Sequence, residues 1–272
     1  MITYKNQYGK TLDTESIKKI FSQEGNITGD VLKFTFPRYD LMVIIGNIML
    51  EPDLALTSWV AFDQLDNKSM IMGDLVLLEG EVESVISYLL KNGIEVTALH
   101  NHLLFESPRV MYLHIKGVGD PIKLAQILKN ALSLTTTPLG GNQQPSSLIE
   151  WSLVENFFGR KGSHKGNVLQ LSFPRNVIIT DDGHQLSPAM GISHGINFQY
   201  LGDKVATTGD FVLLENEVNP VAQILSENNI IITALHNHMI TENPRLFFMH
   251  FWAVNKLENL AQPLWSVISL AS

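Results

Sequence analysis

The chain has 272 residues, a formal net charge of -8, 45% hydrophobic residues and 17% charged residues, which together describe an ordinary globular protein. It contains no cysteine, so disulfides, zinc fingers, iron–sulfur clusters and thiol nucleophiles are excluded. Any bound metal must therefore use His, Asp or Glu ligands. The acidic balance also argues against a nucleic-acid partner, because neutralising phosphates requires a basic surface.

The first half of the chain predicts short helices alternating with extended segments. Apolar residues at Ile17, Ile20 and Phe21 indicate a helix, and a second helix is indicated over 82–90, where apolar residues recur at helical spacing. Gly93 is expected to end that helix in a left-handed conformation. A closing helix should begin at Asp120-Pro121, with Asp as the cap. The extended segments expected between these helices are 31–36, 40–48, 74–78, 94–104 and 109–115.

The second half repeats the first. A shift of 136 residues superimposes 73–114 on 209–250 without a gap, and 22 of these 42 positions are identical. The sequence therefore predicts a first repeat over 1–138 and a second over 139–272, with a linker at about 135–146. In the second repeat, Ser147 and Glu150 resemble a capping box, Asn228-Asn229 takes the place of Gly93, and Pro263 predicts a kink or a later start in the last helix.

We expect an α+β fold made by a tandem duplication. Each unit would contain a helix, antiparallel strands, a second helix, a histidine-bearing hairpin and a closing helix. Because each copy alone would leave an open sheet edge, we expect the two copies to pack together with pseudo-twofold symmetry. A homodimer is compatible with this organisation as well.

The predicted hairpin carries three histidines. His100 and His102 lie two residues apart on an expected strand, so both imidazoles should leave the same face. With a turn centred near Ser107, His100 would pair with His114, and with a centre one residue later His102 would do so. Either register places the three imidazoles on one face, within reach of one divalent metal. The second repeat has the same arrangement in His236, His238 and His250.

Three imidazoles suit zinc, nickel, copper or ferrous iron, with zinc the preferred candidate, and they leave a position for water or substrate. The alternative is that these histidines are hydrogen-bonded structural residues repeated by descent. Against this alternative, Leu103, Met111 and Tyr112 have all changed in the second repeat while the three histidines have not. The sequence therefore favours metal binding.

Acidic residues near the hairpin are the candidates for proton transfer. Glu79, Glu106, Glu215 and Glu242 are the catalytic candidates, and Glu81 and Glu217 are retained beside them. The competing interpretation for Glu79 and Glu81 is stabilisation of a helix N-terminus, and Glu106 could simply cap a turn. Asp74 and Asp210 are expected to hold a turn at the start of a strand.

Other cofactor motifs are missing from the sequence. It has no P-loop, no GxSxG elbow and no HExxH helix, and Gly117-Val118-Gly119 lacks the third glycine of a dinucleotide fingerprint. No apolar run approaches the length of a membrane-spanning helix, and the N-terminus shows no signal peptide. The sequence as it stands predicts a cytoplasmic protein, or a periplasmic or secreted one if a signal peptide has been removed.

Several segments carry a family resemblance. Phe36-Pro37-Arg38, the segment 72–77, the ALHNHLL segment at 98–104 and the ESPR turn at 106–109 resemble the bacterial LppY/LpqO family. That resemblance implies a family without an assigned activity, some of whose members are lipoproteins. The HxH pattern with a later histidine is also distantly similar to the fold group of acetolactate decarboxylase, which places such histidines around a metal.

We therefore expect a metal-binding protein with a small-molecule ligand or substrate, in which a zinc-dependent hydrolase or decarboxylase is the leading hypothesis. Two alternatives stay open. The chain could be a metal- or ligand-binding module without catalysis, or a structural or interaction protein without a metal.

Overall fold

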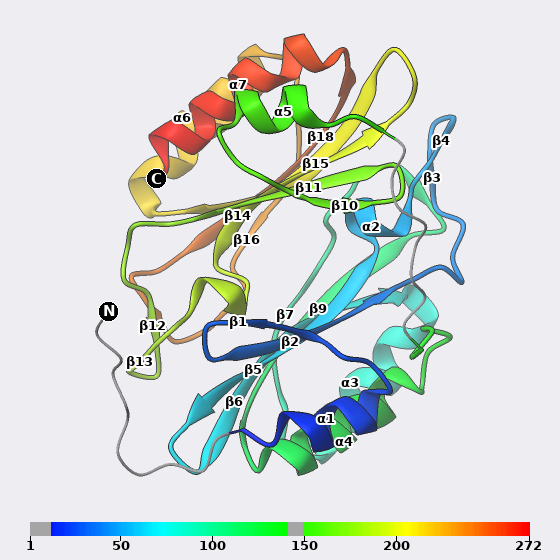
Figure 1. Ribbon diagram of the computed structural model, residues 1–272, viewed down its shortest axis with the longest axis vertical. Helices are drawn as coiled ribbons and strands as arrows, with labels where there is room; N and C mark the ends of the chain where they lie inside the picture. The colour runs from blue at the N-terminus through cyan, green and yellow to red at the C-terminus, as the bar shows by residue number, and fades with distance from the viewer. Residues whose placement is uncertain (1–11, 141–148) are drawn as a thin grey trace.

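The computed structural model describes residues 12–140 and 149–272, which form four layers (Figure 1). Two six-stranded sheets lie in the middle, and helices cover the outer face of each sheet. The first sheet comes from the first copy and the second sheet from the second copy. The fold is therefore the expected duplicated α+β unit, with the two sheets facing each other.

The two large sheets have the same antiparallel strand order. In spatial order, the first consists of β1 (Asn26–Thr28), β2 (Val31–Pro37), β5 (Thr57–Leu65), β6 (Lys68–Leu78), β9 (Val110–Gly119) and β7 (Glu95–His100). The second consists of β10 (Ser163–Lys165), β11 (Val168–Pro174), β14 (Ser193–Tyr200), β15 (Val205–Leu213), β18 (Phe247–Asn255) and β16 (Ile231–His236).

Two small three-stranded sheets complete the strand structure. They are β4 (Ile48–Met49), β3 (Ile44–Ile45) and β8 (Glu106–Ser107), and β13 (His184–Gln185), β12 (Thr180–Asp181) and β17 (Glu242–Asn243). The helices are α1 (Thr14–Phe21), α2 (Pro52–Ala55), α3 (Val82–Lys91), α4 (Pro121–Leu132), α5 (Ser152–Phe157), α6 (Glu215–Glu227) and α7 (Leu257–Leu270), with 3₁₀ turns η1 (Glu79–Glu81) and η2 (Pro188–Met190).

The helices agree closely with the periodicity of the sequence. The expected helix over 82–90 is α3, and the Asp120 side chain caps α4 by accepting a hydrogen bond from the Lys123 amide. Gly93 and Asn229 both have positive φ, at 77° and 57°, as their matched positions predicted. The last helix does not start later: α7 runs through Pro263. Ser147 of the expected capping box lies outside the described residues.

The predicted hairpin is the main error in the strand assignment. The strand expected over 94–104 ends at His100, and the turn residues Glu106 and Ser107 pair with β3 instead. The expected strand over 40–48 is reduced to the two-residue strand β3 and the start of β4. The two strands of the expected hairpin are therefore not joined by a tight turn, because the residues of the expected turn pair with β3. The local sequence pattern does not predict this pairing, since β3 is distant in sequence.

Strand alternation divides the buried apolar side chains between two kinds of core. On β2, Leu32, Phe34 and Phe36 face the helices and form part of the core of the first copy. Val31, on the other face, packs in a cluster that contains Phe248 of the second copy. Because two such clusters contain residues from both copies, the inner faces of the sheets are packed together.

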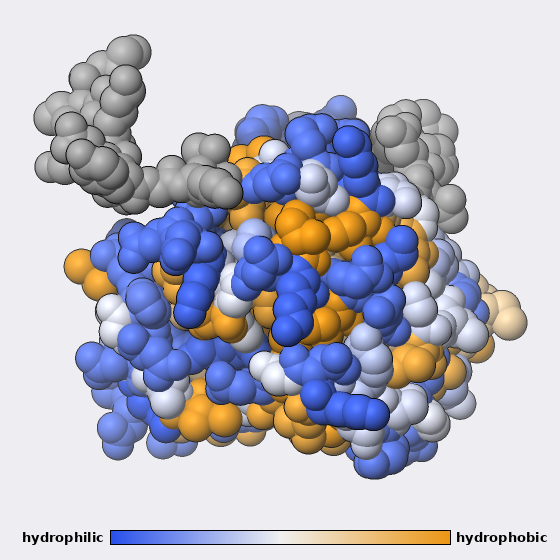
Figure 2. Space-filling view, turned by 90° about the horizontal axis from the view of Figure 1, so that it is seen from below, coloured by the Kyte–Doolittle hydropathy of each residue, from blue (hydrophilic) through white to orange (hydrophobic). Residues whose placement is uncertain are grey.

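Figure 2 views the molecule from the side of α1, α3 and α4, where hydrophilic side chains cover most of the surface around smaller apolar patches. Within residues 12–140 and 149–272, every helix falls short of the length and apolarity needed to cross a bilayer.

A buried arginine supports the same corner of each copy. Arg38 donates to the Val76 carbonyl and to both carboxylate oxygens of Glu81, while Glu81 also accepts from the Leu78 amide. Arg175 and Glu217 repeat this arrangement against Val212 and Leu214. The retained Phe-Pro-Arg segment and the second glutamate of each Glu-x-Glu pair are therefore structural partners.

One buried backbone amide at equivalent positions of the two copies donates to a different side chain in each copy. His194 is fully buried; its Nδ1 accepts from the Val212 amide and its Nε2 donates to the Ala271 carbonyl. In the first copy Ser58 stands at the equivalent strand position and accepts from the Val76 amide. Burial lowers the pKa of His194 to about 4, so this imidazole stays neutral in the folded state.

Replacing His194 with serine should flatten the pH dependence of stability. Below the ordinary histidine pKa of 6.5, this imidazole is protonated in the unfolded chain but stays neutral in the folded chain. Its contribution to the free energy of unfolding is therefore fully present above pH 6.5 and is lost as the pH falls towards 4. Urea unfolding of chelator-treated protein between pH 4.5 and 7.5 gives the free energy of unfolding at each pH. In His194→Ser, the slope of this free energy against pH should be smaller by up to about 1.4 kcal/mol per pH unit. Parallel curves for the two proteins would contradict this assignment.

Candidate functional site

A strand bulge places the histidines of the first copy on the inner face of its sheet. His100 ends β7 opposite Tyr112, and His114 lies on β9 opposite Ala98. The register shifts by one residue between Val96 and Ala98, at a bulge that changes which residues face inward. The predicted pairing of His114 with His100 or His102 is therefore wrong, whereas the predicted common face for the strand histidines is correct.

The second copy repeats this geometry. His236 ends β16, His250 lies on β18 opposite Ala234, and the same one-residue shift falls between Ile232 and Ala234. His102 and His238 each follow their strand by two residues, in the loop after it. Hydrogen bonds join the first of these loops to β16 of the other copy, since the Asn101 amide donates to the Thr233 carbonyl and the Thr233 hydroxyl donates to the His102 carbonyl.

The six histidines meet in one place, and we call them the histidine cluster. Its members are His100, His102, His114, His236, His238 and His250. The shortest separations between ring centroids join the copies: 3.5 Å for His100–His236, 3.8 Å for His102–His250 and 3.6 Å for His114–His238. Within one copy the shortest is 4.9 Å. The two predicted triads are thus parts of a single cluster between the sheets.

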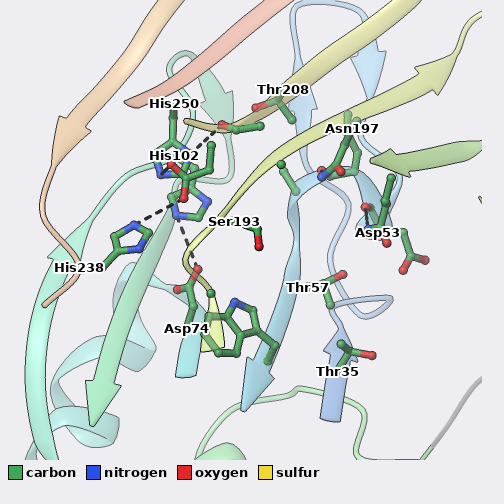
Figure 3. Close-up of a pocket in the computed structure, with 18 of the residues that line it drawn as sticks. Thr35, Asp53, Thr57, Asp74, His102, Ser193, Asn197, Thr208, His238 and His250 are labelled. Carbon is green, nitrogen blue, oxygen red and sulfur yellow. Dashed lines mark hydrogen bonds and ion pairs between the residues drawn. The ribbon is translucent and has the colours of Figure 1, made fainter. Parts of the chain in front are cut away.

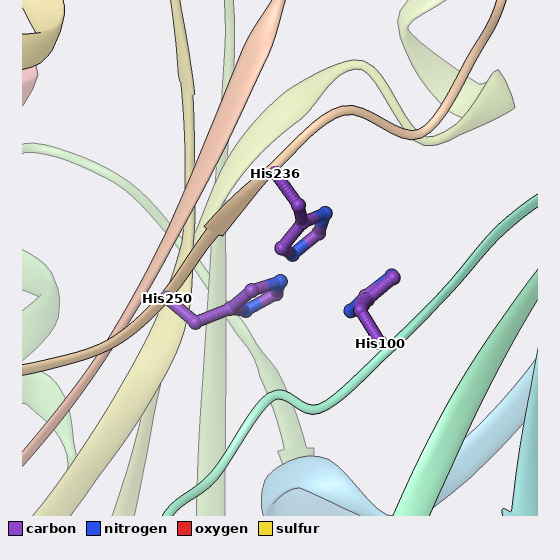
Figure 4. Close-up of side chains that lie close together, drawn as sticks. All are labelled: His100, His236 and His250. Atoms are coloured by element: carbon purple, nitrogen blue, oxygen red, sulfur yellow. The ribbon is translucent and has the colours of Figure 1, made fainter.

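Several subsets of the cluster have the spacing of metal ligands. One potential ligand atom from each of His100, His102 and His114 lies within 4.8 Å of the others, as the sequence predicted for this triad. His250 belongs to two further groups, one with His100 and His236 and one with Asp210 and His238. Figure 4 shows His100, His236 and His250 directed toward one another. A single ion could therefore bind ligands from both copies.

The imidazole nitrogens that face the interior have no partners. The Nε2 atoms of all six cluster histidines are buried and lack a hydrogen-bond partner among the described residues. The Nδ1 atoms of His100, His236 and His250 lie 3.2, 3.4 and 3.0 Å from backbone carbonyls. A carbonyl only accepts, so these Nδ1 atoms carry the hydrogen and Nε2 keeps its lone pair, which is the tautomer that binds a metal.

Two aspartates complete the cluster. Asp74 on β6 lies opposite His114, and its Oδ2 is 3.6 Å from His102 Nε2 and 3.8 Å from His114 Nε2. Asp210 on β15 lies opposite His250 and is 3.8 Å from the Nε2 atoms of His238 and His250. These separations exceed a hydrogen bond but approach the ~3.3 Å expected between two ligands that each lie ~2.0 Å from one ion.

Burial keeps the imidazoles neutral in the absence of a metal. Burial lowers the pKa of His100 to about 4 and that of His236 to about 3, and it holds the pKa of the other four well below the ordinary value. Burial raises the pKa of Asp74 to about 7, against the opposing effect of Lys33. A divalent cation would supply the positive charge that this group of buried lone pairs lacks.

A cavity of about 340 Å³ opens beside the cluster. Its wall includes both aspartates and four of the six histidines: Asp74, Asp210, His102, His114, His238 and His250. Figure 3 shows the labelled imidazoles at one end of this cavity, with Asn197, Asp53 and Thr57 at the other. An ion held by the cluster would therefore be accessible to a small molecule.

The predicted catalytic glutamates lie elsewhere. Glu79 is exposed beside Arg109, and Glu215 is exposed at the start of α6. Glu106 lies in β8, and Glu242 accepts hydrogen bonds from Arg245 and from the Leu246 amide. None of these four glutamates lines the cavity, whereas Asp74 and Asp210 do.

The sequence contained a signal for the two aspartates. Gly73-Asp74 and Gly209-Asp210 are retained in both copies, although the local pattern predicts a turn at the start of a strand there. They lie instead in the middle of long strands, beside the strands that carry His114 and His250. The three histidines without a counterpart in the first copy, His164, His184 and His194, do not line the cavity.

Comparison with known proteins identifies the family. A family model described as Domain of Unknown Function (DUF1259) matches residues 15–134 and 152–269, and the chain belongs to this family. No curated protein matches it. Among solved structures, it is similar to the crystal structure of a trimeric bacterial microcompartment shell protein PduB, with a TM-score of 0.23, 11% identity and coverage of 91% of this chain and 89% of that chain. A likeness this weak carries no argument about function.

Replacing a cluster histidine with leucine should stabilise the metal-free protein. His114→Leu removes a buried nitrogen that has no partner among the described residues, which should raise the free energy of unfolding of the metal-free protein by about 1 kcal/mol. The increase in this free energy on adding zinc should be smaller than in the unchanged protein. The neighbouring Tyr112→Phe is the control: it removes a hydroxyl that donates to the Ala55 carbonyl, so it should lower stability by about 1 kcal/mol. Urea unfolding measures both, and a loss of more than about 2 kcal/mol in His114→Leu would assign the imidazole a structural role.

Proposed function

We propose that the histidine cluster binds a divalent transition metal, with zinc preferred, at a centre shared by the two copies. The observation that carries this proposal is the set of six buried Nε2 atoms that have no partner among the described residues and that lie in one cluster together with two carboxylates. Buried polar atoms normally have a partner, and leaving six of them unpaired would be costly for a purely structural core. Zinc, nickel, copper and ferrous iron all accept imidazole and carboxylate ligands.

We further propose that the metal-loaded protein is an enzyme acting on a small molecule, by hydrolysis or decarboxylation. When bound, a divalent ion in such a site polarises a carbonyl or acidifies a water molecule. The cavity gives a substrate access to the cluster, and an ion held by a group of three ligands would keep a coordination position for water or substrate. Asp74 and Asp210 lie beside the histidines and line the cavity, which places a carboxylate where it can accept and return a proton of a bound substrate.

A binding module without catalysis is the second candidate. The same cluster and cavity would hold a metal and a small ligand without turnover. The resemblance to the LppY/LpqO family is compatible with either role, since that family has no assigned activity. Asp74 and Asp210, which both line the cavity, favour the enzyme because a site for proton transfer needs a carboxylate next to the substrate.

Elemental analysis tests the metal proposal. Untagged protein purified without chelator should contain at least one equivalent of a transition metal, or should take up zinc with a rise in melting temperature. The double variant His102→Ala, His238→Ala should lose this metal, whereas His184→Ala, which removes an exposed histidine outside the cluster, should keep it. Protein without metal and without any response to zinc would refute the proposal.

Turnover distinguishes the enzyme from the binding module. Panels of small esters, lactones and keto acids should reveal activity that chelation removes and zinc restores. Metal binding without turnover would favour the module, and full activity in His100→Ala, His236→Ala would exclude catalysis through the cluster.

A further inference from the structure

The wall of the cavity is not symmetric, although the chain is duplicated. Lys33 on β2 and Gln170 on β11 stand at matched positions, and Trp59 on β5 matches Gly195 on β14. All four line the cavity. The two copies thus contribute the same metal-binding residues but different residues to the remainder of the wall, where selection of a ligand would occur.

Two amide side chains from the second copy are already engaged. The Gln170 amide donates to the Asp53 carbonyl, and the Asn197 amide donates to the Leu54 carbonyl. Both bonds hold the α2 segment of the first copy against the second sheet. These two amides therefore have structural partners and offer little to a ligand.

Lys33 is different. It is the one cationic side chain among the described residues that line the cavity. Its Nζ lies 3.8 Å from the centroid of the Trp59 ring, and no hydrogen-bond acceptor or close ion-pair partner is found for it within residues 12–140 and 149–272. Asp74 acts on this ammonium electrostatically without forming an ion pair with it, and it raises the pKa of Lys33 against the effect of burial. A partly buried ammonium without a direct anionic contact is incompletely compensated, so a bound anion that touches it would gain a charge-assisted hydrogen bond here.

The aromatic contact fixes the position of this ammonium. Gly191 of the second copy packs against the Trp59 ring so closely that a β-carbon there would lie 2.7 Å from the indole. The indole is thereby held between the copies, and the Lys33 ammonium rests on it. Burial lowers the pKa of Lys33 to about 8, which leaves most of the ammonium protonated at pH 7.

We propose that the cavity binds a small organic monocarboxylate, with Lys33 as the anchor for the carboxylate and the histidine cluster facing the other end of the molecule. The cavity volume of about 340 Å³ lies at the small end of ligand pockets, which favours a compact acid. This inference deepens the proposed function, because it assigns a substrate class to the same site. The Lys33 contact itself requires no metal.

Ligand-observed NMR titration of the full chain tests the proposal in the zinc-loaded and the metal-free states. The probes are acetate, butyrate and hexanoate, each compared with its neutral amide. At least one acid should bind about tenfold more tightly than its amide, and Lys33→Met should remove that difference while leaving the metal content unchanged. Lys33→Gln, which installs the residue found at the matched position of the second copy, should behave in the same way.

Lys68→Met is the control, because it removes the same charge from an exposed position on β6. It should leave binding of the acids unchanged. Equal binding of acids and amides, or acid binding that survives both Lys33 variants, would overturn the inference even if the protein binds metal. Acid binding that depends on Lys33 in a protein without metal affinity would support the anchor while refuting the metal centre.

Discussion

The architecture depends on the face-to-face packing of two sheets around buried nitrogen lone pairs. Apolar clusters between the inner faces hold the sheets together. One of them contains Val31 of the first copy and Phe248 of the second. The same packing removes the Nε2 atoms of the histidine cluster from water, and no group in the part of the chain that the structure describes forms a hydrogen bond with them. The apolar burial thus opposes a desolvation cost that a bound cation would relieve.

Duplication alone does not explain why the histidines meet. Two independent sites would follow if the copies packed through their helices or sheet edges. The copies instead pack through the sheet faces that carry the histidines, and hydrogen bonds of Asn101 and Thr233 join the loop after β7 to β16 next to the cluster. Each copy therefore contributes half of the histidine cluster, and the cavity beside it acquires a wall from each copy. The two copies differ in that wall, as at Lys33 and Gln170, while the histidines are the same in both.

Much of the fold was accessible from periodicity and from the internal repeat. The helix over 82–90 followed from apolar spacing, and the common face of His100 and His114 followed from residue parity. The pairing register of β7 with β9 could not be predicted in this way. The bulge before Ala98 and the pairing of Glu106 with Ile45 depend on contacts distant in sequence. The merging of the two triads was equally inaccessible, since no local pattern reports which faces of the two copies meet.

The sequence predicted the histidines of the candidate site but not its two aspartates. Histidines at retained positions pointed to ligands because apolar neighbours changed around them. Asp74 was misassigned because a Gly-Asp pair before an apolar run also fits a turn, and its position beside His114 appears only when β6 and β9 pair. Lys33 carried no signal at all, because its importance lies in the indole beneath it and in the lack of a direct anionic contact among the described residues.

Zinc K-edge X-ray absorption of the zinc-loaded chain tests the shared centre most directly. The account predicts a first shell of nitrogen and oxygen at about 2.0–2.1 Å with the outer-shell scattering of at least three imidazoles. That signal should drop when the histidines of either copy alone are replaced. A first shell of oxygen without imidazole scattering, or a spectrum unchanged by the loss of one copy's histidines, would contradict a centre built from both copies.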